Sequence, residues 1–401
     1  MKMNKWMMSL VLVTSSAFAQ GGSSHGGGGG NVLECIESGK IKYYLLDVWE
    51  AKNEGQNIEM GGPTLRTMQE KIEYVRARYA KIDPVRAQAY ADEANKMAED
   101  IQALKLNQAT PNGLVLFQGP LENTADANPD NSFKSLYHDE KPTHTQCAIG
   151  QLVLQKPKIS PLDPFYKIDR HYWEFLSLDQ QVATLYHEAI YKEFRSVGVY
   201  NSKAARNLNG LVMSGKILNI TSSQYVEMIR SQGLKSFLLG GLFNAFGAVT
   251  LDSRGEIVGL ENQSFQFGNL KFILDQIQFN DEHEFVSAVF GVSSLLKLNT
   301  TKLRNVRYPA IVNNGSSSAP NFEAKTEAYG GSSSSGWNSV DDVVREHPNY
   351  AIVNVFGGYL KSISKDTISI EGLQINMGES AVYNLTVDQS GNILTEEKRS
   401  K

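Results

Sequence analysis

Cysteine and histidine are scarce in this sequence of 401 residues, which contains two cysteines and seven histidines. The two cysteines lie far apart, so the CxxC pairs of zinc ribbons and thiol oxidoreductases are absent. The sequence also has no Gly-rich phosphate loop and no GxSxG nucleophile elbow between a strand and a helix. A formal net charge of −4 and the lack of a basic aromatic stripe argue against a nucleic-acid partner.

Long hydrophobic runs are missing as well. The run Trp6–Val13 is too short to cross a bilayer, and no later run approaches the ~20 apolar residues of a membrane-spanning helix. This run follows Lys2 and Lys5 and precedes Ala17–Ala19, a pattern typical of a cleavable signal peptide. We therefore expect residues 1–19 to be removed, leaving a periplasmic or secreted chain with no integral membrane segment. Loss of the two lysines would change the formal charge from −4 to −6.

The beginning of the mature chain is rich in glycine and serine. The segment Gln20–Asn31 (QGGSSHGGGGGN) favours a flexible tether, because glycine and serine bury little surface and lose much entropy on ordering. Beyond it, Cys35 and Cys147 are expected to form a disulfide in an oxidising compartment. Closing a loop of roughly 110 residues would contribute about 4–5 kcal/mol by the loop-entropy estimate. Two buried free thiols remain the alternative, since spacing in sequence does not give distance in space.

One predicted helix, Ser177–Val197, carries the clustered chemistry of the sequence. Ser177 and Gln180 have the spacing of a capping box at its start, and Gly198 is placed to end it. A broad apolar face at helical spacing is formed by Leu178, Val182, Leu185, Tyr186, Ala189, Ile190 and Phe194. This face predicts a helix that packs into a core.

Within this helix the run HEAIY, His187 to Tyr191, resembles the active helix of zincin metallopeptidases. The resemblance implies that His187 binds zinc and that Glu188 is the catalytic residue that activates water. The second histidine of that motif is replaced by Tyr191, whose phenol ionises only near pH ~10 when unperturbed. With Tyr191 as the second ligand, the nearest candidates to complete the metal site are His171 and Glu174.

A structural role also explains the residues of the HEAIY run. Glu188 and Lys192 form an i,i+4 pair in the favourable order, and His187 would then be a polar residue at the edge of the core. The helix is also similar to HEAIY helices of uncharacterised exported bacterial proteins, which implies an envelope location without indicating an activity.

The rest of the chain predicts an α+β protein. Residues 32–233 are expected to form a mixed domain containing a hairpin over 32–50, helices over 63–81 and 85–106, a strand over 147–155 and the HEAIY helix. From about Ser236 short β-prone runs alternate with turns, which indicates antiparallel sheet. We expect a β-rich region at 234–312, a Gly/Ser-rich linker at 313–336 and a second β-rich region at 337–401.

Two functions are compatible with these features. The first is a non-catalytic binding or structural protein without a cofactor, whose β-rich half engages an unidentified envelope or extracellular protein. The alternative is a zinc-dependent, peptidase-like hydrolase built on His187 and Glu188.

Overall fold

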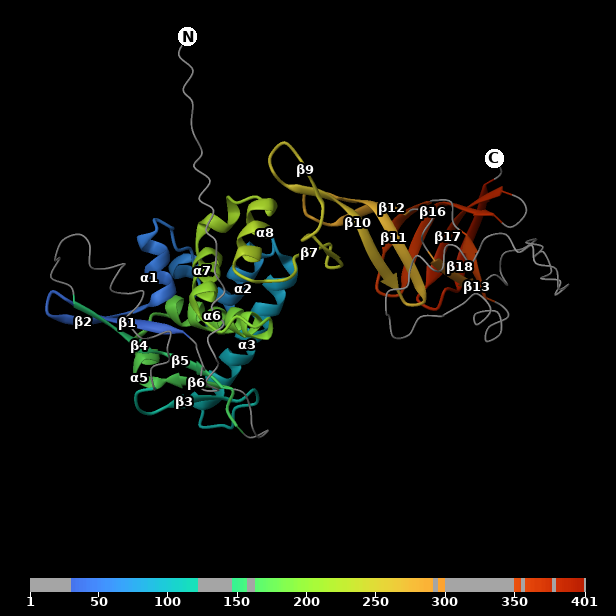
Figure 1. Ribbon diagram of the computed structural model, residues 1–401. Coiled ribbons are helices and arrows are strands. Elements are labelled where there is room, and N and C mark those ends of the chain that lie inside the picture. The colour runs from blue at the N-terminus through green and yellow to red at the C-terminus, as the bar shows by residue number, and fades with distance from the viewer. Residues whose placement is uncertain are drawn as a thin grey trace, which may run out of the picture.

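The computed structural model describes residues 30–121, 146–156, 163–290, 295–299, 350–354, 358–376 and 380–399. It confirms an α+β protein, in which helices and small sheets are followed by a β-rich C-terminal region (Figure 1). The expected signal peptide, the linker 313–336 and all of the tether before Gly30 lie outside the described residues. Among the helices that the structure describes, none has the length and apolar character needed to cross a membrane.

The N-terminal part contains all the described helices. Its elements are β1 (Asn31–Glu37), β2 (Lys40–Leu45), α1 (Leu46–Asn53), η1 (Gly62–Thr64), α2 (Met68–Tyr79), α3 (Pro84–Lys105), β3 (Leu114–Phe117), β4 (Gln146–Gln151), β5 (Val153–Gln155), β6 (Tyr166–Asp169), α5 (Arg170–Phe175), α6 (Leu178–Ser196), α7 (Lys203–Met213), η3 (Gly215–Leu218) and α8 (Ser222–Ser231).

Two three-stranded sheets flank these helices. One has the order β2-β1-β4 and is antiparallel, and the other has the order β3-β6-β5, with β3 and β6 parallel. The predicted strand over 147–155 is interrupted at Leu152. The backbone N–H groups of Leu152 and Val153 both donate to the carbonyl of Gly30, at 3.0 and 3.1 Å, so the strand leaves β1 at this point and continues as β5.

The predicted hairpin over 32–50 is correct only in its first part. The turn at Ser38 and Gly39 is present, with positive φ angles of 51° and 76°. Its second strand ends at Leu45, however, and residues 46–53 form helix α1. The apolar residues of α1 are buried at helical spacing, so tertiary packing overrides the β propensity of this segment. The helix also turns Asp47 into the core, where it is 1% exposed.

Helix α6 lies at the centre of the N-terminal part and contacts α2, α3 and α7. Ser177 and Gln180 form the predicted capping box, and Gly198 has the positive φ expected just beyond the helix. The apolar face is buried except for Leu178, which is partly exposed, and Tyr186 also donates a hydrogen bond to the carbonyl of Ile72 on α2. The sequence therefore predicted this element and its buried face correctly.

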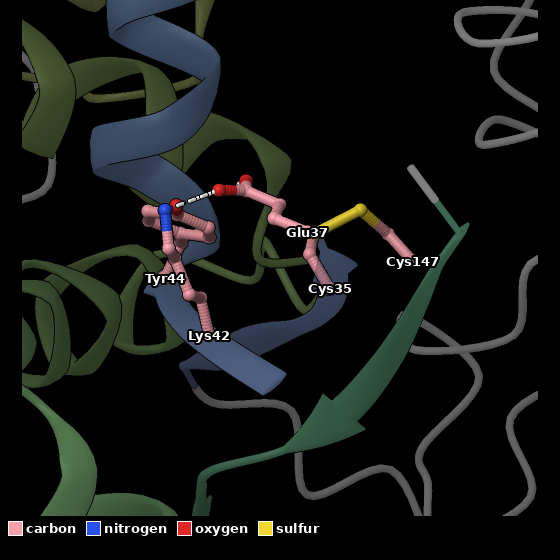
Figure 2. The surroundings of a disulfide bond; sticks show 5 residues. All are labelled: Cys35, Glu37, Lys42, Tyr44 and Cys147. Atoms are coloured by element: carbon pink, nitrogen blue, oxygen red, sulfur yellow. Dashed lines mark hydrogen bonds and ion pairs between the residues drawn. A yellow bond between two sulfur atoms is a disulfide. The ribbon is translucent and has the colours of Figure 1, made fainter. Parts of the chain in front are cut away.

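The disulfide between Cys35 and Cys147 is confirmed. The two residues are directly opposite each other on β1 and β4, and Cys35 is 1% exposed. Figure 2 shows the bond beside Glu37, whose carboxylate accepts hydrogen bonds from Lys42 at 2.6 Å and Tyr44 at 2.9 Å. The bridge therefore ties the N-terminal hairpin to a strand that is more than 100 residues further along the chain.

The C-terminal part begins with two short strands and continues as one large antiparallel sheet. Its elements are β7 (Leu238–Leu239), β8 (Phe243–Asn244), β9 (Val249–Leu251), β10 (Ile257–Phe267), β11 (Leu270–Phe279), β12 (Phe285–Phe290), β13 (Leu295–Asn299), β14 (Tyr350–Asn354), β15 (Gly358–Ile363), β16 (Thr367–Asn376), β17 (Ser380–Asp388) and β18 (Ile393–Arg399).

Ten of these strands form the sheet, with the order β14-β13-β11-β12-β15-β16-β17-β18 and with β10 and β9 added next to β11. Two of the strands are long, at 11 and 10 residues. Residues 257–267 form β10, and residues 367–376 form β16 with a register shift near Gly372. Asn269 in the β10–β11 turn donates to the carbonyl of Gln389 in the β17–β18 turn at 2.8 Å. The sheet therefore curls so that these two turns meet.

The two parts meet along α8 and the ends of α3 and α6. The guanidinium of Arg86 on α3 binds Asp83 at 2.9 Å and Glu193 at 2.8 Å, and it donates to the carbonyl of Ser236 at 2.7 Å. On the other side, Ser222 of α8 accepts a hydrogen bond from the backbone N–H of Ile257. A buried ionic network thus fixes the point where the helical part gives way to the β-rich part.

Candidate functional site

His187 and Glu188 are neighbours on α6 and are both fully buried. Successive residues on a helix point about 100° apart, so the two side chains meet different partners. His187 faces α1 and α7, whereas Glu188 faces the start of β1 and the end of β5. The central position of α6 explains why this motif lies in the interior.

The imidazole of His187 is held by Asp47. Its Nδ1 lies 2.6 Å from Oδ2 of Asp47, and both side chains have no exposed surface. The same carboxylate oxygen accepts a second hydrogen bond, at 2.7 Å, from the amide of Asn209 on α7. Asn209 also donates to the carbonyl of Ala183, which fixes the orientation of its amide. Asp47 therefore joins α1, α6 and α7 at one oxygen atom.

The carboxylate of Glu188 has two neutral donors. Its Oε1 accepts the backbone N–H of Gly30 at 2.7 Å, and its Oε2 accepts the amide of Gln155 at 2.7 Å. The amide of Gln155 also donates to the backbone carbonyl of Glu188. These bonds connect α6 to the first described residue of the chain and to β5.

Burial and mutual attraction act in opposite directions on these groups. Burial favours the neutral form of Asp47, but the charge and hydrogen bond of His187, together with Asn209, hold the pKa of Asp47 below its ordinary value. Burial also favours neutral His187, yet Asp47 and, more weakly, Glu188 raise its pKa. Burial raises the pKa of Glu188, because its hydrogen bonds and His187 offset only part of the desolvation. Asp47 and His187 thus form a buried ion pair.

Several polar atoms around this pair have no hydrogen-bond partner among the described residues. They are Nε2 of His187, Oδ1 of Asp47, Oδ1 of Asn209 and Oε1 of Gln155. Buried polar atoms are usually paired, and an unpaired one costs about 1–3 kcal/mol. A histidine whose Nδ1 is oriented by a carboxylate while its Nε2 remains free is the arrangement of a general base or a metal ligand.

The other residues predicted from the zincin resemblance lie in different surroundings. The hydroxyl of Tyr191 donates to the backbone carbonyl of Tyr200 at 2.7 Å. His171 is exposed on α5 and lies 3.1 Å from the hydroxyl of Tyr43, while exposed Glu174 pairs with Arg170 at 2.7 Å. Within the described ranges, no three residues among His, Cys, Asp and Glu are grouped so that they can hold a metal ion.

A surface hollow of about 400 Å³ lies elsewhere on the N-terminal part. It is lined by residues of the α1–η1 connection and of η3, including Glu54, Glu59 and Lys216. None of the residues predicted from the HEAIY helix lines it.

Comparisons with family models, with curated proteins and with solved structures give no match for this chain.

Sequence reasoning missed Asp47, Asn209, Gln155 and Gly30. Asp47 sits inside an apolar run, and an acidic residue flanked by Leu45, Leu46 and Val48 signals a buried carboxylate with a partner. Asn209, which lies next to Leu208 in a predominantly apolar stretch of α7, carries the same signal. Neither signal identifies the partner, because the contacts join residues more than 100 positions apart.

Proposed function

We propose that the protein is exported to the cell envelope or the exterior and acts there as a non-catalytic binding or structural protein. The observation that supports this best is the complete burial of His187 and Glu188. A catalytic group must touch its substrate, whereas these side chains have no exposed surface and bind residues of their own domain. The Cys35–Cys147 disulfide is compatible with export, because such bonds persist in oxidising compartments.

The β-rich half offers a surface for an envelope or extracellular protein partner. Strand β9 is short, all three of its residues are exposed, and within the described residues it pairs only with β10. Its apolar side chains Val249 and Leu251 are 36% and 46% exposed. Unpaired strand edges with apolar side chains are where extended segments of partner proteins add to a sheet.

A photo-crosslinking residue placed at position 251 tests this proposal in cells that produce the full-length chain. We expect one discrete crosslinked protein, which disappears when Val249 and Thr250 are both replaced by lysine and persists in His187→Ala. A matched crosslinker at exposed Leu394 on β18 serves as the control position. Absence of a discrete product at position 251, or an identical product at both positions, would contradict binding at β9.

A second function, a zinc-dependent hydrolase, is favoured by one observation. His187 has the oriented Nδ1 and unpartnered Nε2 of a metal ligand, with Asp47 in the position of the outer carboxylate that commonly supports such a ligand. The described residues do not supply a set of three ligands around it. This function therefore rests on His187 alone, and we derive no catalytic step from it.

Metal analysis separates the two functions. The chain from Gln20 is purified without chelator or polyhistidine tag, and its zinc content is measured by plasma mass spectrometry beside His187→Ala and His171→Ala. Stoichiometric zinc in the parent that is lost in His187→Ala would overturn the non-catalytic proposal. A parent chain free of metal would exclude the zinc hydrolase.

A further inference from the structure

One face of the sheet β2-β1-β4 carries a group of aromatic rings where it meets α5 (Figure 1). The ring of Tyr172 lies over Gly150 of β4, where a Cβ atom would be only 2.5 Å from the tyrosine hydroxyl oxygen. Tyr43 of β2 stacks on Phe175 with 5.1 Å between ring centroids. His171 contacts both of these rings, at 5.6 and 5.0 Å. The small residue at position 150 thus lets α5 approach the sheet, and we call Tyr43, His171, Tyr172 and Phe175 the aromatic surface.

The aromatic surface is open to solvent and continues onto the tip of the β1–β2 hairpin. Phe175 is 60% exposed. Ile36 and Ile41 are directly opposite each other in the hairpin and are 46% and 54% exposed. Because side chains alternate along a strand, Ile36, Ile41 and Tyr43 lie on the same face. Large apolar side chains that gather in this way mark an interaction site, whereas single ones are ordinary.

A carboxylate lies next to the aromatic surface. Glu34 of β1 is directly opposite Tyr43, on the same face of the sheet, and is half-buried. On its other side, β4 presents only the small side chain of Ala148. Burial and, after it, the charge of Glu34 raise the pKa of both Tyr43 and Tyr172, because a nearby carboxylate opposes ionisation of a phenol.

The basic residues of these elements are engaged elsewhere. Lys40 and Lys42 of β2 lie on the opposite face of the sheet, where Lys42 binds Glu37 at 2.6 Å. Arg170, the first residue of α5, binds a glutamate one turn further along the helix at 2.7 Å. Within the described ranges Glu34 is therefore a carboxylate without an ion pair, and its surroundings complement a positive charge.

We propose that the aromatic surface binds an arginine side chain presented by another protein, with Glu34 as the partner of the guanidinium. A guanidinium group is planar, stacks on aromatic faces and binds a carboxylate through two parallel hydrogen bonds. It is also more weakly hydrated than an ammonium group, so a half-buried carboxylate among aromatic rings favours arginine over lysine. Ile36 and Ile41 would contact apolar side chains that flank the arginine. Binding here does not depend on binding at β9.

Short peptides of the form acetyl-Leu-X-Leu-amide, where X is arginine, lysine or citrulline, test this site. Citrulline has the shape of arginine but no charge. The peptides are titrated into the chain from Gln20 with isotope-labelled isoleucine methyl groups, and binding is followed by NMR. We expect the arginine peptide to shift the methyl signals of Ile36 and Ile41. It should bind at least about fivefold more tightly than the citrulline peptide, because it adds an ion pair and a cation–π contact, and the lysine peptide should be intermediate.

Two substitutions remove the groups that select arginine. Glu34→Gln keeps the size of the side chain and removes its charge, and it should lower the preference for arginine over citrulline at least about twofold. Phe175→Ala should have a similar effect, and it leaves the core intact because Phe175 is largely exposed. Glu37→Gln, on the opposite face of β1, and Phe117→Ala, at the exposed end of β3, are the matched controls and should leave the preference unchanged.

A neutral oligosaccharide, chitotetraose, is titrated alongside as a ligand of different chemistry that also stacks on aromatic rings. Methyl shifts with the oligosaccharide and none with the arginine peptide would assign the aromatic surface to a carbohydrate and overturn the arginine site. Equal affinities for the arginine and citrulline peptides would overturn it as well. So would an unchanged preference in either Glu34→Gln or Phe175→Ala.

Discussion

Replacing Asp47 with asparagine is expected to destabilise the N-terminal part and to change how its stability depends on pH. The substitution keeps the size of the side chain but removes the charge that His187 and Asn209 share. Both buried donors then face a neutral amide in place of a carboxylate. Breaking a buried, hydrogen-bonded ion pair costs about 3–5 kcal/mol, which is a large fraction of the 5–15 kcal/mol that is typical of a folded domain.

The pH dependence follows from the directions of the two pKa shifts. The raised pKa of His187 makes a contribution to stability that is fully present below the unfolded histidine value of about 6.5. That contribution is lost as pH rises through the folded value. The lowered pKa of Asp47 makes a contribution that is present above about 3.9 and is lost as pH falls through its folded value. The difference in free energy of unfolding between parent and Asp47→Asn should therefore be larger at pH 5.5 than at pH 9.

Urea denaturation followed by circular dichroism at both pH values measures this difference. Proton NMR of the His187 ring supplies a second check, because the pKa should fall in Asp47→Asn, where burial is opposed mainly by Glu188. Glu73→Gln is the control, since Glu73 forms an exposed pair with Arg76 on α2 and should cost no more than about 1 kcal/mol. A loss below about 1 kcal/mol in Asp47→Asn, or an equal loss at both pH values, would refute the buried ion pair.

Three further predictions concern other parts of the fold. Arg86→Ala should lower the free energy of unfolding by about 3–5 kcal/mol in urea titrations, because it leaves buried carboxylates unpaired where the two parts of the chain meet. Replacing Cys35 and Cys147 together with serine should lower it by about 4–5 kcal/mol, since the bridge closes a loop of 112 residues, as checked in the same titration. Gly358→Ala should cost about 1–3 kcal/mol in thermal unfolding, because the added Cβ would lie 2.6 Å from the buried ring of Phe290.

Each of these predictions has a matched comparison. Arg76→Ala removes a more exposed arginine bound to an exposed carboxylate and should have an effect below about 1 kcal/mol. The cysteine effect should be reproduced by reducing the parent protein, and an unchanged midpoint after reduction would contradict it. Gly39→Ala is the comparison for Gly358→Ala. Nothing lies within 4 Å of the Cβ added at Gly39, so only the positive φ of this residue opposes the substitution, and no steric clash contributes.

Much of the local structure follows directly from the sequence. The capping box and apolar face of Ser177–Val197 defined helix α6, and the alternation of short β-prone runs with turns defined the β-rich region after Ser236. The pairing of two cysteines was also predicted. These features depend on near neighbours, on periodicity, or on a choice between very few partners. The conversion of residues 46–53 from strand to helix was missed, because their packing outweighs local propensity.

The environment of the HEAIY motif was decided by the tertiary structure. The sequence placed His187 and Glu188 on one helix and allowed two interpretations of them. They could be structural residues at the edge of the core, or they could form part of a metal site. The fold buries both fully and gives them separate partners, Asp47 for the histidine and the nitrogen of Gly30 for the glutamate. Those contacts span 140 and 158 residues, and no periodicity in sequence encodes them. Composition and spacing therefore determined which residues carry the chemistry, while long-range packing decided what each one faces.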